Sequence, residues 1–508
     1  MIKLTPALFI VVLFLNLSAS AAEKKDSLIN WQPWSAAAFE QAKKEKKLVL
    51  MDLEAVWCHW CHVMDAKTYH DPKVVGLINK HFVAIRVDQD KQPDISNRYE
   101  DYGWPATVVF DANGTEIIKK RGYMAPQFMG WFLEAVIAEP TPDAHDTVQR
   151  TITAGMDAFL SKEQKELLNT RFEFIYDKKH KGWGRRQKFL HSDSVEYAMV
   201  RGAAGSKQHE AMAKDTLDAA RVLIDPEWGG MYQYSDESDW LSPHFEKVMK
   251  IQTDSLRLYA LAYTQWGRKK DLESALATYR FLTGILQSPD GVFYTSQDAD
   301  LNDEVDGHTY FLLKNTARRK LGMPRIDKHI YARENAWIIS ALTALYRATG
   351  DKKHLEEASK VANWIIKNRS VDGGFIHAQK ETEATFLGDT LAMGQAFLDL
   401  YESTTDKKWL SHASVAAKVI EQKFKDNKGG FSTLLSSTEN LLITPVKHIN
   451  SQIMMARFSN LLHKHTGDKE HKALAQHAMR FLSSTDLTDQ RRLLAGVLLA
   501  DREINGAN

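Results

Sequence analysis

The spacing of hydrophobic residues changes near residue 145 and divides the chain into two parts. Before that point, apolar runs of five or six residues, typical of buried strands, alternate with amphipathic stretches typical of helices. The predicted elements are a helix from Ser35 to about Lys47, a strand over 48–53, a helix over 63–80, strands over 82–87 and 106–110, a turn at 111–114 leading into a fourth strand, and a helix over 128–138. This order predicts an α/β unit.

After residue 145, helical periodicity dominates and two recurrent turns divide the sequence. A polar turn that ends one helix and starts the next recurs at Gly205, Gly267, 349–353, 404–408 and 466–470, spaced by 55 to 83 residues. A glycine-aromatic turn alternates with it at 182–184, 229–232, 290–294, 373–375 and 429–431. Two turns per repeat describe a helical hairpin, and residues 145–505 have room for six. We therefore predict an (α/α)6 toroid whose inner helices line a funnel; an open superhelical solenoid is the alternative.

The first 21 residues have the composition of a secretory signal peptide. Lys3 supplies a positive start, residues 7–17 form an apolar run, and Ala-Ser-Ala at 19–21 fits a cleavage site. The run is shorter than the ~20 residues of a membrane span, which disfavours a retained anchor. We expect an exported protein, periplasmic or secreted, with no membrane span after cleavage of the signal.

Charge and cysteine content narrow the possible chemistry. The 66 basic and 65 acidic residues nearly cancel and form no long run of one sign, so we expect no nucleic-acid partner. Both cysteines of the chain lie in the segment 57–62, Trp-Cys-His-Trp-Cys-His. A disulfide across two residues closes a tiny loop and removes little entropy from the unfolded chain. Reactivity is therefore a better explanation for the pair than structural bridging.

Cys58 and Cys61 follow the first predicted strand and open the next helix. A dithiol in this place, within the order β-α-β-β-β-α, is the plan of the thioredoxin fold. Unpaired N–H groups and the helix dipole favour thiolate at a helix amino terminus. We expect Cys58 to be the more exposed, attacking thiolate and Cys61 to resolve the mixed disulfide. The predicted domains are a signal peptide over 1–21, a thioredoxin-like domain over 22–140, and the toroid over 145–505.

Six further residues fit roles around this dithiol. Asp52 lies in the strand beneath the motif and is a candidate base for Cys61; the alternative is a hydrogen-bonded residue at a strand edge. Pro105 is placed to be a cis-proline beside the cysteines, although a trans proline that begins a strand fits the same pattern. The residues expected to tune the pair are Trp57, His59, Trp60 and His62, of which the histidines either add positive charge or are solvated surface side chains.

Two other uses of the motif are less compatible with its surroundings. Cys-x-x-Cys-His is also the attachment signal for c-type haem, with His62 as a ligand, but a strand precedes it and Trp104–Pro105 follows. Zinc held by two adjacent Cys-His pairs is disfavoured by tetrahedral geometry. We therefore expect neither a metal nor a cofactor.

Several strings resemble the spermatogenesis-associated thioredoxin-like family, whose bacterial members were long carried as a domain of unknown function. They are Val-Trp-Cys-His-Trp-Cys-His-Val-Met at 56–64, Phe-Val-Ala-Ile-Arg-Val-Asp at 82–88, Gln-Pro-Asp at 92–94 and Gly-Trp-Pro at 103–105. The segment 48–71 is also similar to the thioredoxin-like domain of the periplasmic disulfide reductase. The resemblance implies a toroid like that of N-acylglucosamine epimerases and six-hairpin glycosidases.

Motifs of that family also occur in the second part of the chain, with departures. The segment 240–247 matches closely, whereas 188–189, 297–300, Asn335 and Asp389 match less specifically. The chain has Lys250-Ile251, Gln297 and Arg186-Gln187 where members usually have Tyr-Asp, Glu and Ala-Pro, and the lost carboxylates weaken a case for sugar chemistry. The candidate toroid site consists of His244, Glu246, Asp298 and Asp300, for which loop hydrogen bonds and helix caps are the alternative.

Three functional hypotheses follow. The first is an exported thiol–disulfide oxidoreductase that acts on client proteins, requires an external redox partner, and uses the toroid for recognition. The second is a carbohydrate-active, epimerase-like toroid enzyme with an accessory thioredoxin domain, which binds a sugar. The third is a binding protein without turnover. The sequence does not decide between oxidase and reductase.

Overall fold

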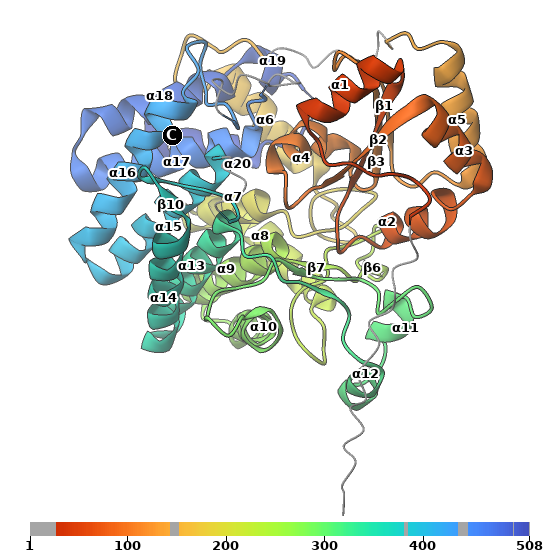
Figure 1. The fold of residues 1–508 in the computed structure, drawn as a ribbon. Coiled ribbons are helices and arrows are strands. Elements are labelled where there is room, and N and C mark those ends of the chain that lie inside the picture. Colours follow the sequence, from red (N-terminus) through yellow and green to blue (C-terminus); the bar gives the residue numbers. More distant parts are fainter. Residues whose placement is uncertain (1–26, 143–151, 380–384, 435–444, 491, 507–508) are drawn as a thin grey trace, which may run out of the picture.

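The computed structural model describes residues 27–142, 152–379, 385–434, 445–490 and 492–506. The predicted signal peptide at 1–21 lies outside these residues. Figure 1 shows two units: strands flanked by helices, formed by the first part of the chain, and a ring of helices, formed by the second. Within the described residues, none of the helices is both long and apolar enough to cross a membrane.

A four-stranded mixed sheet forms the centre of the first unit. Its strands are β1 (Leu48–Glu54), β2 (Phe82–Asp88), β3 (Ala106–Phe110) and β4 (Glu116–Arg121), in the order β2-β1-β3-β4. β2 is parallel to β1, while β3 and β4 run antiparallel to their neighbours. Side chains alternate across a strand, so Val49, Met51 and Leu53 enter one core and Leu50 enters the other. The predicted thioredoxin plan is confirmed.

Helices cover both faces of this sheet. α1 (Ala36–Glu45), capped by Ser35, and α4 (Pro93–Tyr99) pack on one face, and α3 (Pro72–His81) and α5 (Pro126–Ala138) pack on the other. The unit also contains short elements, among them α2 (His59–Val63) after β1 and the 3-10 turn η2 (Glu100–Tyr102) after α4. The sequence did not predict α4 or η2.

The single helix predicted over 63–80 is wrong, because the structure breaks it. α2 continues into a π-helical turn, η1 (Met64–Thr68), and α3 begins afresh at Pro72. The Asp71 side chain caps α3 by accepting hydrogen bonds from the Lys73 and Val74 amides. Proline has no amide hydrogen to donate to a preceding turn, so it suits the start of a helix and not its interior.

Twelve helices of the described residues form two concentric layers in the second unit. The inner helices are α7 (Ser192–Ala203), α9 (Met249–Trp266), α13 (Ala332–Thr349), α15 (Leu387–Thr404), α17 (Ile449–Thr466) and α20 (Ala495–Asn505). The outer helices are α6 (Lys162–Ile175), α8 (Lys207–Ala220), α10 (Lys269–Phe281), α14 (Lys352–Arg369), α16 (Lys407–Phe424) and α18 (Lys469–Leu482). Each inner helix packs against the next, and α20 returns to α7.

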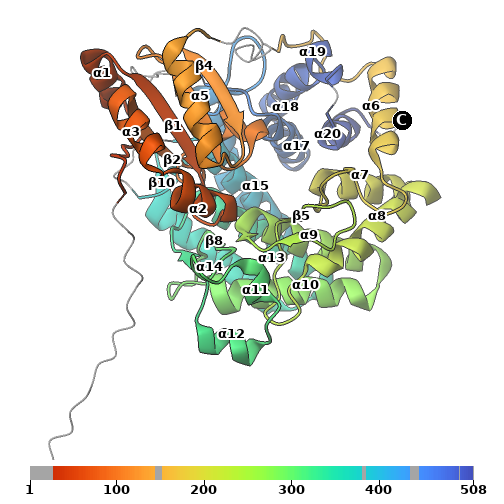
Figure 2. The same cartoon turned by 90° about the vertical axis from the view of Figure 1, so that its right-hand side faces the viewer.

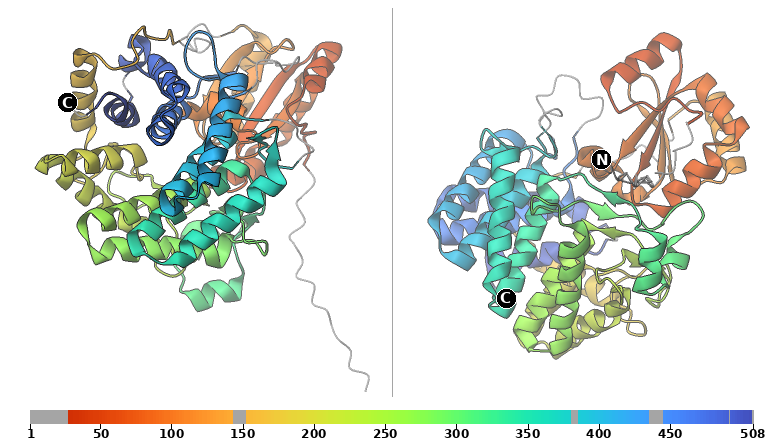
Figure 3. Two further views of the ribbon diagram at one scale, coloured as in Figure 1. Left: turned by 90° about the vertical axis from the view of Figure 1, so that its left-hand side faces the viewer. Right: turned by 60° about the horizontal axis from the view of Figure 1, so that its bottom comes forward.

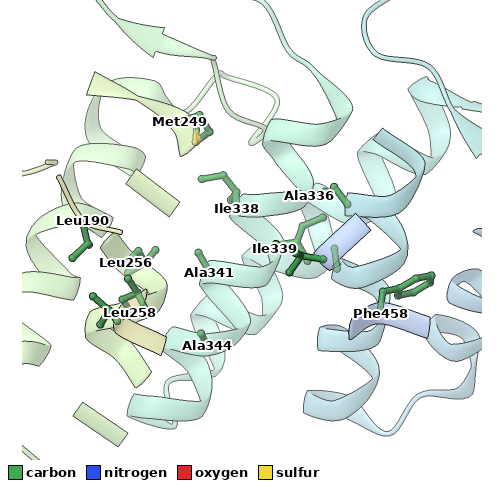
Figure 4. Close-up of a cluster of buried hydrophobic side chains, with 14 of the residues drawn as sticks. Leu190, Met249, Leu256, Leu258, Ala336, Ile338, Ile339, Ala341, Ala344 and Phe458 are labelled. Atoms are coloured by element: carbon green, nitrogen blue, oxygen red, sulfur yellow. The ribbon is translucent and has the colours of Figure 1, made fainter. Parts of the chain in front are cut away.

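This closure confirms the predicted toroid over the open solenoid. The last inner helix, α20, packs on the first outer helix, α6, so the two ends of the helical part meet. Asp501 of α20 accepts a hydrogen bond from the Leu160 amide at 2.8 Å and pairs with Lys165 at 3.0 Å. Apolar side chains fill the space between neighbouring helices, as Figure 4 shows for Leu256 of α9 and Ala341 of α13.

Three of the five glycine-aromatic turns are fixed by an amide side chain from an inner helix. Gln252 binds both the amide and the carbonyl of Met231 at 2.7 Å, and Gln452 does the same for Phe431 at 2.8 and 2.7 Å. Asn335 binds Phe293 in the same way at 2.9 and 3.1 Å. The repeat seen in the sequence is therefore a repeated hydrogen-bonding arrangement that satisfies buried backbone groups.

Shorter elements lie in the loops between the helices. They are η3 (Arg221–Leu223), β5 (Tyr234–Ser235), β6 (Pro243–His244), β7 (Lys247–Val248), η4 (Leu282–Leu286), β8 (Ser296–Gln297), α11 (Gly307–Phe311), α12 (Asn315–Leu321), β9 (Ile326–Asp327), β10 (Ser370–Val371), β11 (Gly374–Phe375) and α19 (Thr485–Thr488). The sheet unit packs against the rim of the ring that carries these loop strands (Figure 3).

Candidate active site

The cysteine motif lies where β1 ends and α2 begins. Cys58 is the N-cap residue of α2, and its Sγ accepts a hydrogen bond from the Cys61 amide at 3.3 Å. Its own amide donates to the carbonyl of Ala55, which fixes the turn after the strand. Both cysteines are free thiols. The sulfur of Cys58 therefore faces the amide groups of the first helical turn, as the sequence predicted.

The expectation that Cys58 is the more exposed cysteine is wrong. Cys58 and Cys61 are each only 4% exposed, and they form a small apolar cluster with Trp57. Trp104 packs on this cluster from within the sheet unit, and Val248 packs on it from the toroid. The second unit contributes to the burial of the motif. The sequence pattern of the first unit alone could not predict this burial.

The peptide bond between Trp104 and Pro105 is cis, in agreement with the expectation for this position. The ring of Trp104 meets that of Trp57 edge-on, with centroids 5.7 Å apart. The cis-proline loop therefore lies beside the cysteines. Trp60, the other tryptophan of the motif, is 40% exposed and stacks on Tyr123 at 5.6 Å, so it faces away from the buried pair.

Asp52 lies in the central strand of the sheet, not at a strand edge. It is opposite Arg86 of β2 and Thr107 of β3, and it is 2% exposed. Its Oδ2 accepts a hydrogen bond from Arg86 Nε at 3.2 Å, while Oδ1 has no hydrogen-bond partner among the described residues. Burial raises the pKa of Asp52 to about 7, although the nearby guanidinium opposes this rise. A carboxylate with this pKa is suited to accept a proton near neutral pH.

Burial also raises the pKa of the Cys61 thiol, and the neighbouring Cys58 sulfur and Asp52 carboxylate raise it further. Cys61 is therefore held as a thiol in the reduced protein. To resolve a mixed disulfide it must lose its proton, and Asp52 is near enough to affect its charge. The role of Asp52 as a general base for Cys61 stays a prediction.

Two of the candidate toroid residues bind the histidines of the cysteine motif. Asp300 Oδ2 lies 2.7 Å from His59 Nδ1 and 3.5 Å from His62 Nδ1, and Asp298 Oδ2 lies 3.5 Å from His62 Nε2. Figures 1 and 2 accordingly place α2 next to the loop strands of the toroid. The two sites that the sequence predicted separately are one site. The histidines are not solvated surface side chains but partners of toroid carboxylates.

These ion pairs shift the pKa of each member. The hydrogen bond from its ring to Asp300 raises the pKa of His59 despite its partial burial. Burial opposes the charge on His62, but Asp300 and Asp298 outweigh it and raise the pKa of His62 to about 9. Burial raises the pKa of Asp298 to about 6, whereas the two histidines hold the pKa of Asp300 below its usual range. His62 is thus cationic at neutral pH, and the cationic form of His59 is favoured.

The other two candidate toroid residues also lie beside the motif. Glu246 is 3% exposed, and its Oε1 accepts from the His59 amide at 3.4 Å and lies 3.8 Å from His244 Nδ1. The ring of His244 stacks on Tyr234 at 4.2 Å. Burial opposes the charge on His244, but Glu246 outweighs it and raises the pKa of His244. The alternative of loop hydrogen bonds and helix caps also describes part of the contacts of the candidate toroid residues, since Asp298 accepts from the Asp300 amide at 3.1 Å and Asp300 accepts from the Gly307 amide at 2.8 Å.

Sequence reasoning missed several contacts that join the two units. The carbonyl of Val56 accepts from Arg325, and the carbonyl of Trp57 accepts from the Ala299 amide at 3.3 Å. On the far side of the motif, His377 Nε2 lies 2.7 Å from the carbonyl of Asp90, and its Nδ1 lies 2.8 Å from Asp389. The resemblance of Asp389 to a family motif was the available signal for this contact.

Asp88 and Asp90, at the end of β2, organise the loop under the motif. Asp88 accepts hydrogen bonds from the amides of Val56, Asp90 and Lys91, and Asp90 accepts from the indole of Trp57 at 2.8 Å. Asp88 thereby ties the ends of β1 and β2 together next to the cysteine motif.

His62, Asp298 and Asp300 form a group, among the described residues, whose donor atoms are close enough to hold a metal ion, within 4.8 Å of one another. Their charges are already matched: His59 and His62 pair with the carboxylates, and Arg325 Nε lies 3.6 Å from Asp298. The zinc site considered from the sequence requires the cysteines and histidines to face one centre. Instead, Nδ1 of both histidines bonds to Asp300, and His62 Nε2 lies 3.1 Å from the carbonyl of Val56.

A cavity of about 790 Å³ occupies the funnel of the toroid. Its wall carries charges of both signs from the inner helices and a few aromatic side chains. Glu196 bridges Arg257 and Arg457 at 2.7 and 2.6 Å, and Lys250 lies over the ring of Trp337. His244, Glu246, Asp298 and Asp300 lie outside this wall, against the cysteine motif. The candidate toroid residues therefore belong to the dithiol site and not to the funnel.

The fold and the site together define a protein with a thioredoxin-fold dithiol unit seated on the rim of an (α/α)6 toroid. A family model described as a protein of unknown function, DUF255 (Thioredox_DsbH), matches residues 13–138, and one for glycosyl hydrolase family 88 matches residues 310–433. An uncharacterized protein of Caenorhabditis elegans is 24% identical over 79% of this chain and 73% of its own length.

Spermatogenesis-associated protein 20 of Homo sapiens is 25% identical over 54% of this chain, which corresponds to 39% of the human protein. The thiol:disulfide interchange protein DsbD of Vibrio vulnificus is 32% identical over 16% of this chain and 15% of its own length. The resemblance to the spermatogenesis-associated thioredoxin-like family, and the partial one to the disulfide reductase, are confirmed. The chain thus spans well under half of the length of the human relative.

A solved structure titled as a sugar epimerase from a ruminal bacterium superposes with a TM-score of 0.53 at 13% identity. It covers 68% of this chain and 99% of the epimerase. At this identity the likeness establishes the (α/α)6 fold of the helical part.

Proposed function

We propose that the protein is a thiol–disulfide oxidoreductase whose reacting groups are Cys58 and Cys61. The observation that carries this proposal is the hydrogen bond from the Cys61 amide to Cys58 Sγ at the start of α2. It places one sulfur where negative charge is favoured and the other one helical turn away. The similarity of the amino-terminal part to DsbD supports the same reading.

The exchange involves four sulfur atoms, two of the protein and two of the substrate, and one proton acceptor. In the reducing direction, the Cys58 thiolate attacks a substrate disulfide, whose S–S bond breaks and releases one thiolate, leaving a mixed disulfide on Cys58. Asp52 then takes the proton of Cys61, whose sulfur attacks Cys58 and releases the second thiolate. The protein ends with a Cys58–Cys61 disulfide, and an external dithiol restores the reduced form. The oxidising direction runs through the same steps in reverse.

Paired cysteine variants test this function. Cys58→Ser should abolish exchange with a disulfide reagent, whereas Cys61→Ser should accumulate a mixed disulfide that mass spectrometry detects on Cys58. Each variant serves as the control for the other, because both remove one buried sulfur at 4% exposure. Equal exchange by both variants and the wild type, or no reaction of the wild type, would refute the proposal.

We also propose export, as the signal sequence predicts. Fractionation of cells that express the full chain should recover it outside the cytoplasm, with an amino terminus after Ala21. Recovery of the uncleaved chain in the cytoplasm would contradict this, and replacing the apolar run at 7–17 should retain the chain there.

A second candidate function is sugar chemistry in the funnel. Its support is the cavity, where Asp193, whose pKa is raised by burial, lies in the same wall as Glu196 and Trp337. The superposed structure is titled as a sugar epimerase. Conversion of aldoses followed by NMR should then persist in Cys58→Ser and be lost in Asp193→Asn. Loss in Cys58→Ser but not in Asp193→Asn would exclude this candidate.

A further inference from the structure

The helical unit covers the dithiol on more than one side. Three residues near Cys58 contact the helical unit: Val56 and Trp57 through their carbonyls, and His59 through its amide and ring. Val248 packs against the apolar cluster that contains both cysteines. An extended polypeptide that approached Cys58 would have to displace these groups, because they already occupy the backbone positions beside the cysteine.

Contacts away from the motif also hold the helical unit against the sheet unit. His377, which is 2% exposed, joins Asp90 of the sheet unit to Asp389 of the toroid, and His448 pairs with Glu100 at 2.7 Å. Breaking the buried contacts of His377 leaves polar groups without partners, which costs free energy. Separating the two units so that a folded protein can reach Cys58 would therefore cost free energy.

The funnel cavity begins close to the covered sulfurs. Val248 contacts the cysteine cluster, and Lys250 and Ile251, in the first turn of α9, line the cavity. The dithiol and the cavity thus adjoin the same short segment of the toroid. The volume of about 790 Å³ lies within the range of small-molecule sites, roughly 300–1,000 Å³.

The charges of the cavity wall indicate what kind of small molecule fits. Lys250, Arg257 and Arg457 are cationic, and Asp193 and Asp254 are acidic. Glu196 engages the two arginines, and Lys250, whose side chain is half-exposed, pairs with Asp254 at 2.5 Å. A ligand that carries both carboxylate and ammonium groups matches this distribution.

We infer that the substrate of the dithiol is a low-molecular-weight disulfide bearing both charges, held in the toroid funnel, and not a folded client protein. The inference rests on the proposed oxidoreductase function and names its substrate class. The small disulfide is the oxidant: its S–S bond breaks, two small thiols leave, and the Cys58–Cys61 disulfide forms. An external dithiol supplies the electrons that restore the reduced protein.

A single-turnover experiment with the full-length reduced protein tests the inference. Cystine, as the small charged disulfide, and insulin, as the protein disulfide, are mixed with it in excess without oxygen. Formation of the Cys58–Cys61 disulfide is followed by quenching and mass spectrometry. We expect cystine to react at least 100-fold faster per disulfide than insulin. Insulin reacting as fast as cystine would overturn the inference, and reaction with neither would overturn the oxidoreductase function and this inference with it.

Lysine variants test the place of binding. Lys250→Ala should raise the apparent Kd for cystine, taken from the concentration dependence of the rate, by at least fivefold. Lys269→Ala, on the exposed start of the outer helix α10, is the matched control and should leave the Kd unchanged. Equal Kd values for Lys250→Ala and the wild type would show that the small disulfide does not enter through the funnel, and would overturn that part of the inference.

Discussion

The imidazole of His59 and the carboxylate of Asp300 lie 2.7 Å apart although 241 positions separate them in the chain. One belongs to the cysteine motif of the sheet unit and the other to a loop of the toroid. The pair shows that the helical unit is part of the dithiol site, and it gives the loop motif at 297–300 a role in positioning α2.

The contact between the units should weaken as the pH rises. The pKa of His62 in the folded protein, about 9, exceeds its ordinary value of 6.5. The charged imidazole therefore contributes stability that is fully present below about pH 6.5 and is lost as the pH rises through 9, up to about 3 kcal/mol. Urea unfolding at several pH values should show this fall.

His62→Gln should be less stable than the wild type at pH 6 and should lose most of the dependence on pH between 6.5 and 9. His308→Gln, whose parent side chain is exposed on α11, is the control. An unchanged pH dependence in His62→Gln would show that His62 is not charged through its contact with Asp298 and Asp300.

Asp52→Asn should slow the second step of exchange. Asparagine cannot accept the proton of Cys61, so release of the mixed disulfide on Cys58 should fall by about 100-fold, the usual scale of general-base catalysis. In the wild type this release should accelerate through about pH 7, the pKa of Asp52, and in the variant that acceleration should disappear. Stopped-flow measurement of thiol release gives both quantities.

Asp65→Asn is the matched control for Asp52→Asn, since Asp65 also binds Arg86, at 2.9 Å, but is partly exposed. It should retain the pH profile of the wild type. If both variants lost the profile alike, disturbance of Arg86 and not proton transfer would explain the effect.

His377→Ala should loosen the two units. The substitution leaves the carbonyl of Asp90 without the nitrogen that lies 2.7 Å away and is expected to cost about 1–3 kcal/mol. Limited proteolysis should then cut between the units faster than in the wild type. His308→Ala is again the control, and equal proteolysis of His377→Ala and the wild type would mean that this contact does not hold the interface.

Gln452→Ala and Gln252→Ala should destabilise the toroid by similar amounts. Each removes an amide that satisfies two buried backbone groups, of Phe431 or of Met231, at a cost of about 1–3 kcal/mol. Thermal unfolding compares them with Gln422→Ala, on the exposed side of α16. Markedly different losses would contradict an equivalent role for the two glutamines.

Much of the fold could be predicted because it follows from local patterns. The buried run at 48–53 gave β1, and the recurring turns gave the hairpins of the toroid. Asp71–Pro72 is a typical start of a helix and indicates a break before α3. The apolar periodicity continues across this point and favoured a single helix instead. Helix α4 was missed because it is short and carries polar residues between Pro93 and Tyr99.

The sequence by itself determined which groups lie together at the cysteine motif: two cysteines separated by one helical turn, an acid in the strand before them, and the loop of Pro105 beside them. These relations are fixed by the geometry of a strand followed by a helix, so neighbouring positions specify them. Only the tertiary structure decided that the sulfurs are buried and that Asp298 and Asp300 serve the dithiol. Burial and charge pairing depend on surfaces far apart in the chain, and no local spacing encodes which of them meet.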